Sequence, residues 1–147
     1  MDLRCSPWKT EIGRRQMVKD NNKRIKFLRG ILFLKWVVTL LVWGLPALVG
    51  PPALFELLGV PFPSDPTFIR LFGAVVTAVA LAYWYAWKDP VRNVAIIKFA
   101  VLDNGLATAT ILFLGFTVGL SSWFFWVSAI LTAFFFLSFT VYMPRSG

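Results

Sequence analysis

Four long apolar segments dominate the pattern of hydrophobic and polar positions along the chain. They cover about residues 30–50, 67–87, 91–117 and 121–143, and short polar or proline-rich segments separate them. About 20 consecutive apolar residues are long enough to cross the hydrocarbon core of a bilayer as a helix. The pattern therefore predicts an all-α protein, built as an up-down bundle of four transmembrane helices.

The composition changes this picture little but excludes other classes. Of the 147 residues, 58% are hydrophobic and 15% are charged, and the mean hydropathy is +0.70. A soluble domain contains roughly 25% charged residues, so the surplus apolar surface is expected to face lipid. The net charge of +8 would favour nucleic acid as the partner of a soluble protein. Here the charge is concentrated at one end of the chain, so it is better explained by membrane orientation, and we expect no nucleic acid partner.

The charge distribution divides the chain into a basic N-terminal arm, residues 1–29, and a transmembrane domain, residues 30–147. Loops that remain in the cytoplasm are enriched in Lys and Arg. The arm and the turn at 88–93 are basic, whereas the segments 51–66 and 117–122 contain no Lys or Arg. Both termini are therefore expected in the cytoplasm. The arm would anchor this topology, or lie on anionic headgroups or a partner.

Proline interrupts the end of the first apolar segment and the loop after it. Pro46 is expected to kink the first helix, because proline lacks an N–H and clashes with the preceding turn. The loop 51–66 contains five prolines. Between them, ALFELLGV is predicted to form a short amphipathic helical turn at the membrane interface, with Glu56 on one side and the apolar residues on the other, namely Leu54, Phe55, Leu57 and Leu58.

Small and aromatic residues predict surfaces for helix packing and for partners. Gly73 begins a stripe of small residues along the second helix, and such stripes let helices approach closely in lipid. An aromatic belt is expected where this helix ends, formed by Tyr83, Trp84, Tyr85 and Trp87. Trp123 and Trp126 open the last helix, whose many Phe side chains are expected to face lipid, another membrane subunit or a flat hydrophobic cofactor.

Polar residues near the middle of the third segment are the main candidate site. Asp103 and Asn104 are adjacent there, and an ionisable group at this depth costs about 3 kcal/mol on insertion scales. At about 1.5 Å per residue from the cytoplasmic side, Asp103 lies roughly 14 Å deep and Lys35 roughly 7–8 Å deep, a difference that a lysine side chain can cover, whereas Arg70 lies near the opposite face. We expect Lys35 to pair with Asp103, and Arg70 to pair with acidic residues of the loop 51–66 or with headgroups. Asp103 then fixes helix packing, binds a ligand or proton, or contacts another subunit.

The sequence lacks the usual catalytic and metal-binding motifs. It has no histidine and one cysteine, Cys5, so the commonest general base, the commonest zinc ligand and any cysteine cluster are missing. Gly-rich phosphate loops and the HExxH and CxxC patterns do not occur. We predict no catalytic and no metal-binding residues. Whether the protein is an enzyme stays open, with a non-catalytic role favoured.

Several motifs together resemble the DoxX-like group of small four-helix membrane proteins. They are PPALFELLGVPFP after the first helix, PTFIRLFGA at the start of the second, KDPVRN after it, and an Asp in the third. The resemblance covers about residues 45–115. It implies an up-down bundle in which Arg70, Gly73 and Asp103 are the positions of interest, and some members of the group are associated with quinone-linked membrane complexes. The long basic arm departs from the pattern, and no redox activity is carried over.

Two functions fit these features. The first is a non-catalytic accessory or scaffold subunit of a larger membrane complex, such as a quinone-linked one, which docks through its aromatic helices and basic arm. The alternative is a binder or carrier of a quinone, isoprenoid or lipid, with Asp103 and Asn104 as the polar end of the pocket. A transporter driven by protonation of Asp103 has less support, because there is one such carboxylate and no inverted repeat. In each case we expect an integral membrane protein of the bacterial inner (plasma) membrane, surrounded by lipid and other membrane subunits.

Overall fold

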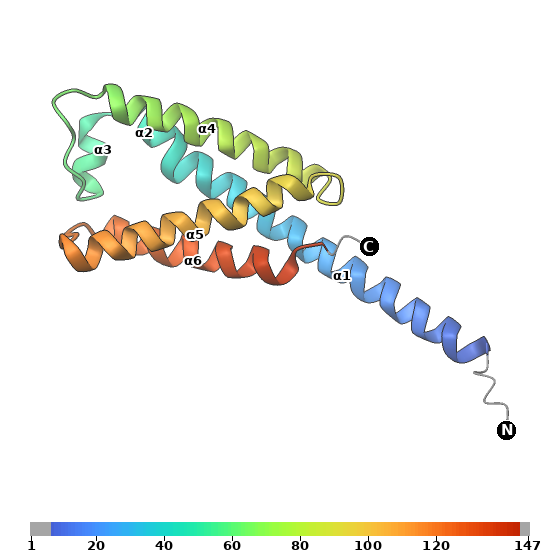
Figure 1. Ribbon diagram of the computed structural model, residues 1–147. Coiled ribbons are helices and arrows are strands. Elements are labelled where there is room, and N and C mark those ends of the chain that lie inside the picture. Colours follow the sequence, from blue (N-terminus) through green and yellow to red (C-terminus); the bar gives the residue numbers. More distant parts are fainter. Residues whose placement is uncertain (1–6, 145–147) are drawn as a thin grey trace.

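The computed structural model describes residues 7–144, and for most of residues 7–18 it describes the backbone alone. All regular structure in this range is helical (Figure 1). Four helices are long and apolar: α1 (Pro7–Val38), α4 (Thr67–Lys88), α5 (Val94–Thr117) and α6 (Trp123–Tyr142). Each contributes a span long and apolar enough to cross a membrane. The prediction of an all-α chain with four long apolar helices is confirmed.

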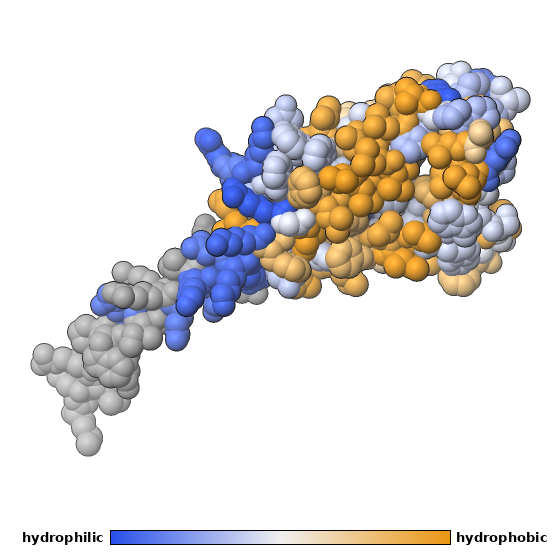
Figure 2. All heavy atoms as spheres, turned by 180° about the vertical axis from the view of Figure 1, so that it is seen from behind, coloured by the Kyte–Doolittle hydropathy of each residue, from blue (hydrophilic) through white to orange (hydrophobic). Residues whose placement is uncertain are grey.

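Helix α1 extends well beyond the other helices at one end of the bundle (Figure 1). It runs without a break from Pro7 to Val38, so the basic arm is helical from Pro7 onward and continues directly into the first apolar segment. Figure 2 shows hydrophilic atoms on the projecting part and apolar atoms over the bundle. We call this end of the bundle the arm end, and the opposite end the α3 end.

Pro46 is preceded by a turn that is wider than an α-helical turn. Residues Thr39–Gly44 form the π-helix η1, and the short helix α2 (Leu45–Val49) follows with Pro46 in its first turn. The N–H of Leu45 bonds to the carbonyl of Leu40, five residues back, which is the π-helical pattern. Since proline cannot donate and crowds the carbonyl four residues before it, the wider turn accommodates what the sequence predicted as a kink.

The long helices associate as two closely packed groups. Helix α4 packs along α1, η1 and α2, and α5 packs along α6, whereas α4 and α5 share little contact. The two groups meet in an apolar core toward the arm end. Its buried residues are Leu28, Ile31, Leu32, Tyr83, Ala86, Ile97, Ala100, Phe135 and Phe139.

The segment between α2 and α4 contains the short helix α3 (Pro52–Leu57). Phe55 is buried and packs its ring 5.0 Å from that of Phe62, while Leu57 is 74% exposed. The prediction that Phe55 and Leu57 share a side is wrong, because residues two apart on a helix point away from each other. Gly59, with φ of 67°, ends α3 in a left-handed conformation that glycine adopts without steric cost.

Arg70 binds the C-terminal end of α2. Its guanidinium donates to the carbonyls of Ala47 at 3.1 Å and Gly50 at 2.8 Å, and it lies over the ring of Phe62. The last carbonyls of a helix lack intrahelical partners and carry partial negative charge, which a cation stabilises. Its partners here are backbone carbonyls, so the predicted pairing of Arg70 with the acidic residues of the loop is wrong.

Two arginines of α1 act in the same way at the arm end. Arg24 donates to the carbonyl of Val141 at 2.8 Å, near the end of α6. Arg29 donates to the carbonyl of Lys88 at 2.9 Å, at the end of α4. The base of the arm is thus attached to the C-terminal ends of two other long helices.

Gly73 allows α4 to approach the backbone of α2. A Cβ atom at this position would overlap backbone atoms of Ala47 and Leu48. Backbone atoms cannot rotate away as a flexible side chain can, so any larger residue separates the two helices.

We expect Gly73→Ala to destabilise the bundle by about 1–3 kcal/mol, the usual cost of overpacking. The measurement is thermal unfolding of the detergent-solubilised protein. Gly30→Ala is the matched control, because a Cβ at position 30 meets nothing within 4 Å, and its melting temperature should stay the same or rise. Equal melting temperatures for the two variants would contradict the close approach.

Candidate functional site

A cluster of polar side chains lies inside the apolar bundle, where α1, α4 and α5 meet. Lys35 is 3% exposed and Asn104 is fully buried. The Lys35 ammonium donates to Asn104 Oδ1 at 2.7 Å, and Asn104 Nδ2 donates to the carbonyl of Ala100 at 2.6 Å. Because lysine can only donate, the amide oxygen must face it. Asn104 therefore uses both polar atoms of its side chain inside the bundle.

Asp103 faces a different partner. It is partly buried, and its Oδ2 accepts a hydrogen bond from the Tyr83 hydroxyl at 2.8 Å. The predicted pairing of Lys35 with Asp103 is wrong in its partner, since adjacent residues on a helix point about 100° apart and Asn104 is the one that reaches Lys35. The opposite charges of Lys35 and Asp103 still attract each other.

Tyr83 belongs to the site and not to an interfacial belt. The sequence placed it in the belt at the end of α4, but it is fully buried. It continues the buried face of α4, which consists of Gly73, Ala80, Tyr83 and Ala86. This spacing was visible in the sequence as an extension of the small-residue stripe, and it is the signal that could have identified Tyr83.

Three aromatic rings surround the Lys35 ammonium. Its Nζ lies 5.0 Å from the ring centroid of Phe135, 5.4 Å from that of Tyr83 and 5.5 Å from that of Trp43. A cation within about 6 Å of a ring centroid is attracted by the negative face of the ring. The expectation that the α6 phenylalanines face lipid fails for Phe135 and Phe139, which are fully buried, although Phe134 is 47% exposed.

A second set of polar contacts joins the same helices closer to the α3 end. Trp43 Nε1 donates to Ser128 Oγ at 3.2 Å, linking η1 to α6. The hydroxyls of Thr108 and Thr132 lie 2.8 Å apart, linking α5 to α6. In lipid each such contact contributes about 0.6 kcal/mol, so together they favour one arrangement of these helices.

The other predicted positions lie away from this cluster. Arg70 and Gly73 contact the short helix α2. Trp126, near the start of α6, donates its ring N–H to the carbonyl of Leu120 at 3.1 Å, and Trp123 is 55% exposed. The structure thus brings together Lys35, Asp103 and Asn104, and leaves Arg70, Gly73, Trp123 and Trp126 outside their site.

The chemistry available to the cluster is that of an ammonium, a carboxylate, an amide and a phenol in apolar surroundings. These groups can hold a hydrogen-bonding ligand or fix the helices to one another. In the part of the chain that the structure describes, no three His, Cys, Asp or Glu side chains gather where they could hold a metal ion.

Comparisons with protein-family models, curated proteins and solved structures give no match to this chain. The resemblance to the DoxX-like group therefore rests on the sequence motifs alone. The function has to be argued from the residues and their geometry.

We expect Asn104→Leu to destabilise the protein by about 2–3 kcal/mol, because it removes the hydrogen-bond acceptor of a buried ammonium. Adding Lys35→Met in the same chain should recover most of this loss, since an apolar pair carries no desolvation penalty. Chemical or thermal unfolding in detergent measures both effects. As a control, Lys98→Met changes an exposed lysine of α5 and should leave Asn104→Leu as unstable as before. A double variant no more stable than Asn104→Leu would contradict the assigned pairing.

Proposed function

We propose that the protein is an integral membrane protein whose four long helices cross the bilayer. Four helical spans of sufficient length and hydropathy support this proposal. Large apolar side chains also cover the outer surface of the bundle, among them Phe68, Phe116 and Ile130, which are 81%, 80% and 70% exposed. Soluble monomers rarely expose contiguous apolar patches of more than a few hundred Å². Lipid is the surrounding that removes this surface from water.

The charges at the two ends of the bundle support an orientation with both chain termini in the cytoplasm. The arm end carries the exposed basic residues Lys23, Lys26 and Arg92, as cytoplasmic segments do. The loop at the α3 end carries Asp65, which accepts hydrogen bonds from Thr67. These bonds lower the pKa of Asp65, although an exposed aspartate is negatively charged at neutral pH even without them. The bacterial inner membrane is the membrane we assign.

Within this membrane we propose the role of a non-catalytic accessory or scaffold subunit of a larger complex. The observation that carries this proposal is the continuous helix α1, which projects from the bundle with no other described helix beside it (Figure 1). Helices in water derive most of their stability from tertiary packing. A projecting helix with Lys19, Lys23 and Lys26 exposed along one side fits an acidic partner surface that packs against it.

The alternative proposal is a binder of a quinone, isoprenoid or lipid. The partly buried Asp103 supports this alternative, because it can serve as the polar end of a binding pocket. Its Oδ2 accepts a hydrogen bond from the Tyr83 hydroxyl, and its second oxygen can accept one from a ligand. Asn104 supports it less than the sequence suggested, since both of its polar atoms are engaged.

We expect a cysteine at Ser64 to react with a membrane-impermeant thiol reagent in spheroplasts, and a cysteine at Asn21 to react only after the membrane is opened. Both positions are exposed, and the comparison uses a chain in which Cys5 is replaced by Ser. Gel-shift labelling measures the outcome. The reverse pattern would contradict the orientation, and labelling of both before lysis would contradict the spanning topology.

We expect the triple substitution of Lys19, Lys23 and Lys26 by Glu to reduce co-purifying subunits by about tenfold, because charge complementarity accelerates docking by that order or more. Quantitative mass spectrometry of the protein purified from native membranes in mild detergent measures this. The triple substitution by Arg keeps the charge and should retain the partners. A wild-type protein that emerges as a lone monodisperse monomer would overturn the subunit role.

A further inference from the structure

The hydroxyl of Thr39 is buried without a partner. Thr39 is 4% exposed, and its Oγ1 has no hydrogen-bond partner among the described residues. Five other helical threonines donate to the carbonyl four residues before them, namely Thr77, Thr108, Thr117, Thr132 and Thr140. Thr39 is the first residue of the π-helix η1 and makes no such bond. A buried hydroxyl left unpaired costs free energy, and a ligand that bonded to it would remove this cost.

The position of Thr39 places it beside the buried ammonium. Lys35, Thr39 and Trp43 follow one another at intervals of four residues and so share one side of the helix. Lys35 bonds to Asn104 of α5, and Trp43 bonds to Ser128 of α6. Thr39 therefore lies on the same side of the helix as Lys35 and Trp43, between these two bridges. Lysine carries three N–H donors, and Asn104 Oδ1 is the acceptor that lies within bonding distance of one of them.

The charges of the site select a neutral ligand. The Lys35 ammonium lies within electrostatic reach of the Asp103 carboxylate, so the two together are neutral. An anionic ligand would leave a net charge buried in apolar surroundings, which is strongly unfavourable. A neutral oxygen with lone pairs, such as a carbonyl, can accept from both the Lys35 ammonium and the Thr39 hydroxyl without this cost.

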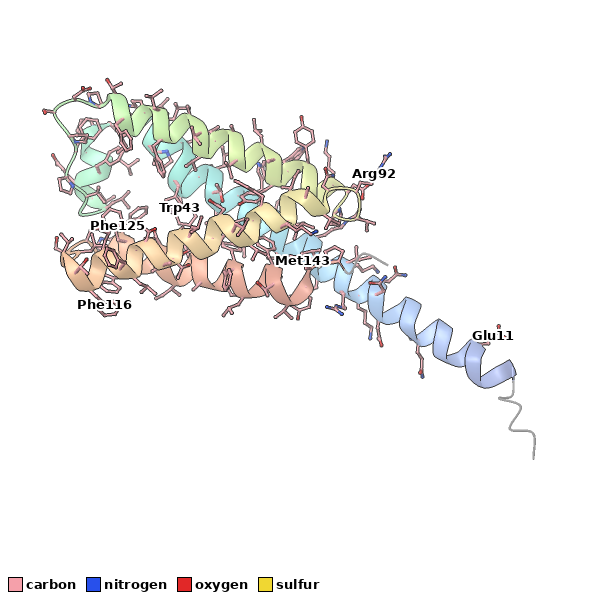
Figure 3. All side chains as sticks on the ribbon, viewed as in Figure 1. Glu11, Trp43, Arg92, Phe116, Phe125 and Met143 are labelled. Atoms are coloured by element: carbon pink, nitrogen blue, oxygen red, sulfur yellow. The ribbon has the colours of Figure 1, made fainter. Side chains whose placement is uncertain are left out.

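Toward the α3 end, the α2–α4 side and the α5–α6 side diverge (Figure 1). Figure 2 shows an opening in the apolar surface there. Figure 3 shows Trp43 and Phe125 in the space between the α2–α4 side and the α5–α6 side. Both are partly buried aromatic residues, of the kind that lines sites for hydrophobic ligands. An apolar body that packed against these two rings would have its polar end on the side of Thr39, which lies one turn before Trp43.

We propose that Lys35 and Thr39 bind the carbonyl oxygen of a neutral, apolar molecule held between the two helix groups. Quinones and ester lipids share this chemistry, and the experiment separates them. The site does not depend on the docking of the arm, so either proposal can fail while the other stands.

The test is calorimetric titration of the detergent-solubilised full chain with two probes, a decyl-substituted benzoquinone and dioctanoylglycerol. Decylbenzene, which lacks a carbonyl, is the ligand control. At least one carbonyl probe should bind saturably, and Thr39→Val should bind it about five- to tenfold more weakly, the effect of one hydrogen bond. Preference for one probe assigns the class.

Two further comparisons keep this test decisive. Thr39→Val keeps the branched shape and removes an unpaired hydroxyl, so it should melt no lower than the wild-type protein. Thr140→Val is the matched control, because Thr140 is exposed on α6 and bonded to its own helix, and its affinity for the probe should be unchanged. Saturable binding of neither probe, equal affinity for decylbenzene, or unchanged affinity in Thr39→Val would each overturn the proposal.

Discussion

A charge buried in an apolar bundle must be surrounded by groups that offset the hydration it has lost, and Lys35 imposes this requirement here. Its offsetting groups come from four other helical segments: the amide of Asn104 on α5, the rings of Tyr83 on α4 and Phe135 on α6, and the ring of Trp43 on η1. Since each has to keep its place, the ammonium fixes how the segments rotate and slide against one another. Polar contacts of this kind specify one packing arrangement of the helices, whereas apolar surfaces alone would allow several.

A second set of charges acts at the helix ends. Arg24 and Arg29 attach the base of the arm to the last carbonyls of α6 and α4, and Arg70 does the same for α2. These guanidiniums are held by backbone dipoles and not by acidic side chains. The arm end therefore keeps its excess of positive charge although two of its arginines are bonded, which is the property that a topology signal requires.

The sequence was sufficient to predict where the long helices lie along the chain. It was insufficient to predict which side chains contact each other between them. Runs of apolar residues bounded by proline, glycine and charge predicted four long helices, and they are present. Depth along a helix axis could be estimated from the rise per residue, and it indicated that the Lys35 side chain is long enough to reach the level of Asp103 and Asn104. The bond from Lys35 to Asn104 agrees with this estimate. Rotation about the axis could not be estimated, and it decided between the two, because neighbours point about 100° apart.

The same lack of rotational information explains two other errors. Tyr83 was assigned to a belt and Phe135 to lipid, although both are in the core. The prediction for Arg70 was wrong for another reason. The carbonyls that bind it belong to the backbone, and residue types do not reveal them. The unpaired hydroxyl of Thr39 lies at the start of the π-helical turn before Pro46. The presence of a proline does not by itself predict such a turn.

The unbroken course of α1 gives the molecule a mechanical property. Gln16 on the projecting part and Lys35 in the cluster belong to one rigid rod and are separated by about 29 Å along its axis. A partner that tilted the outer part of α1 would also displace its inner part. The Lys35 ammonium and the three aromatic side chains around it would then move relative to one another. The π-helical turn begins at Thr39, one turn beyond Lys35, so a change in the direction of α1 would reach this turn next.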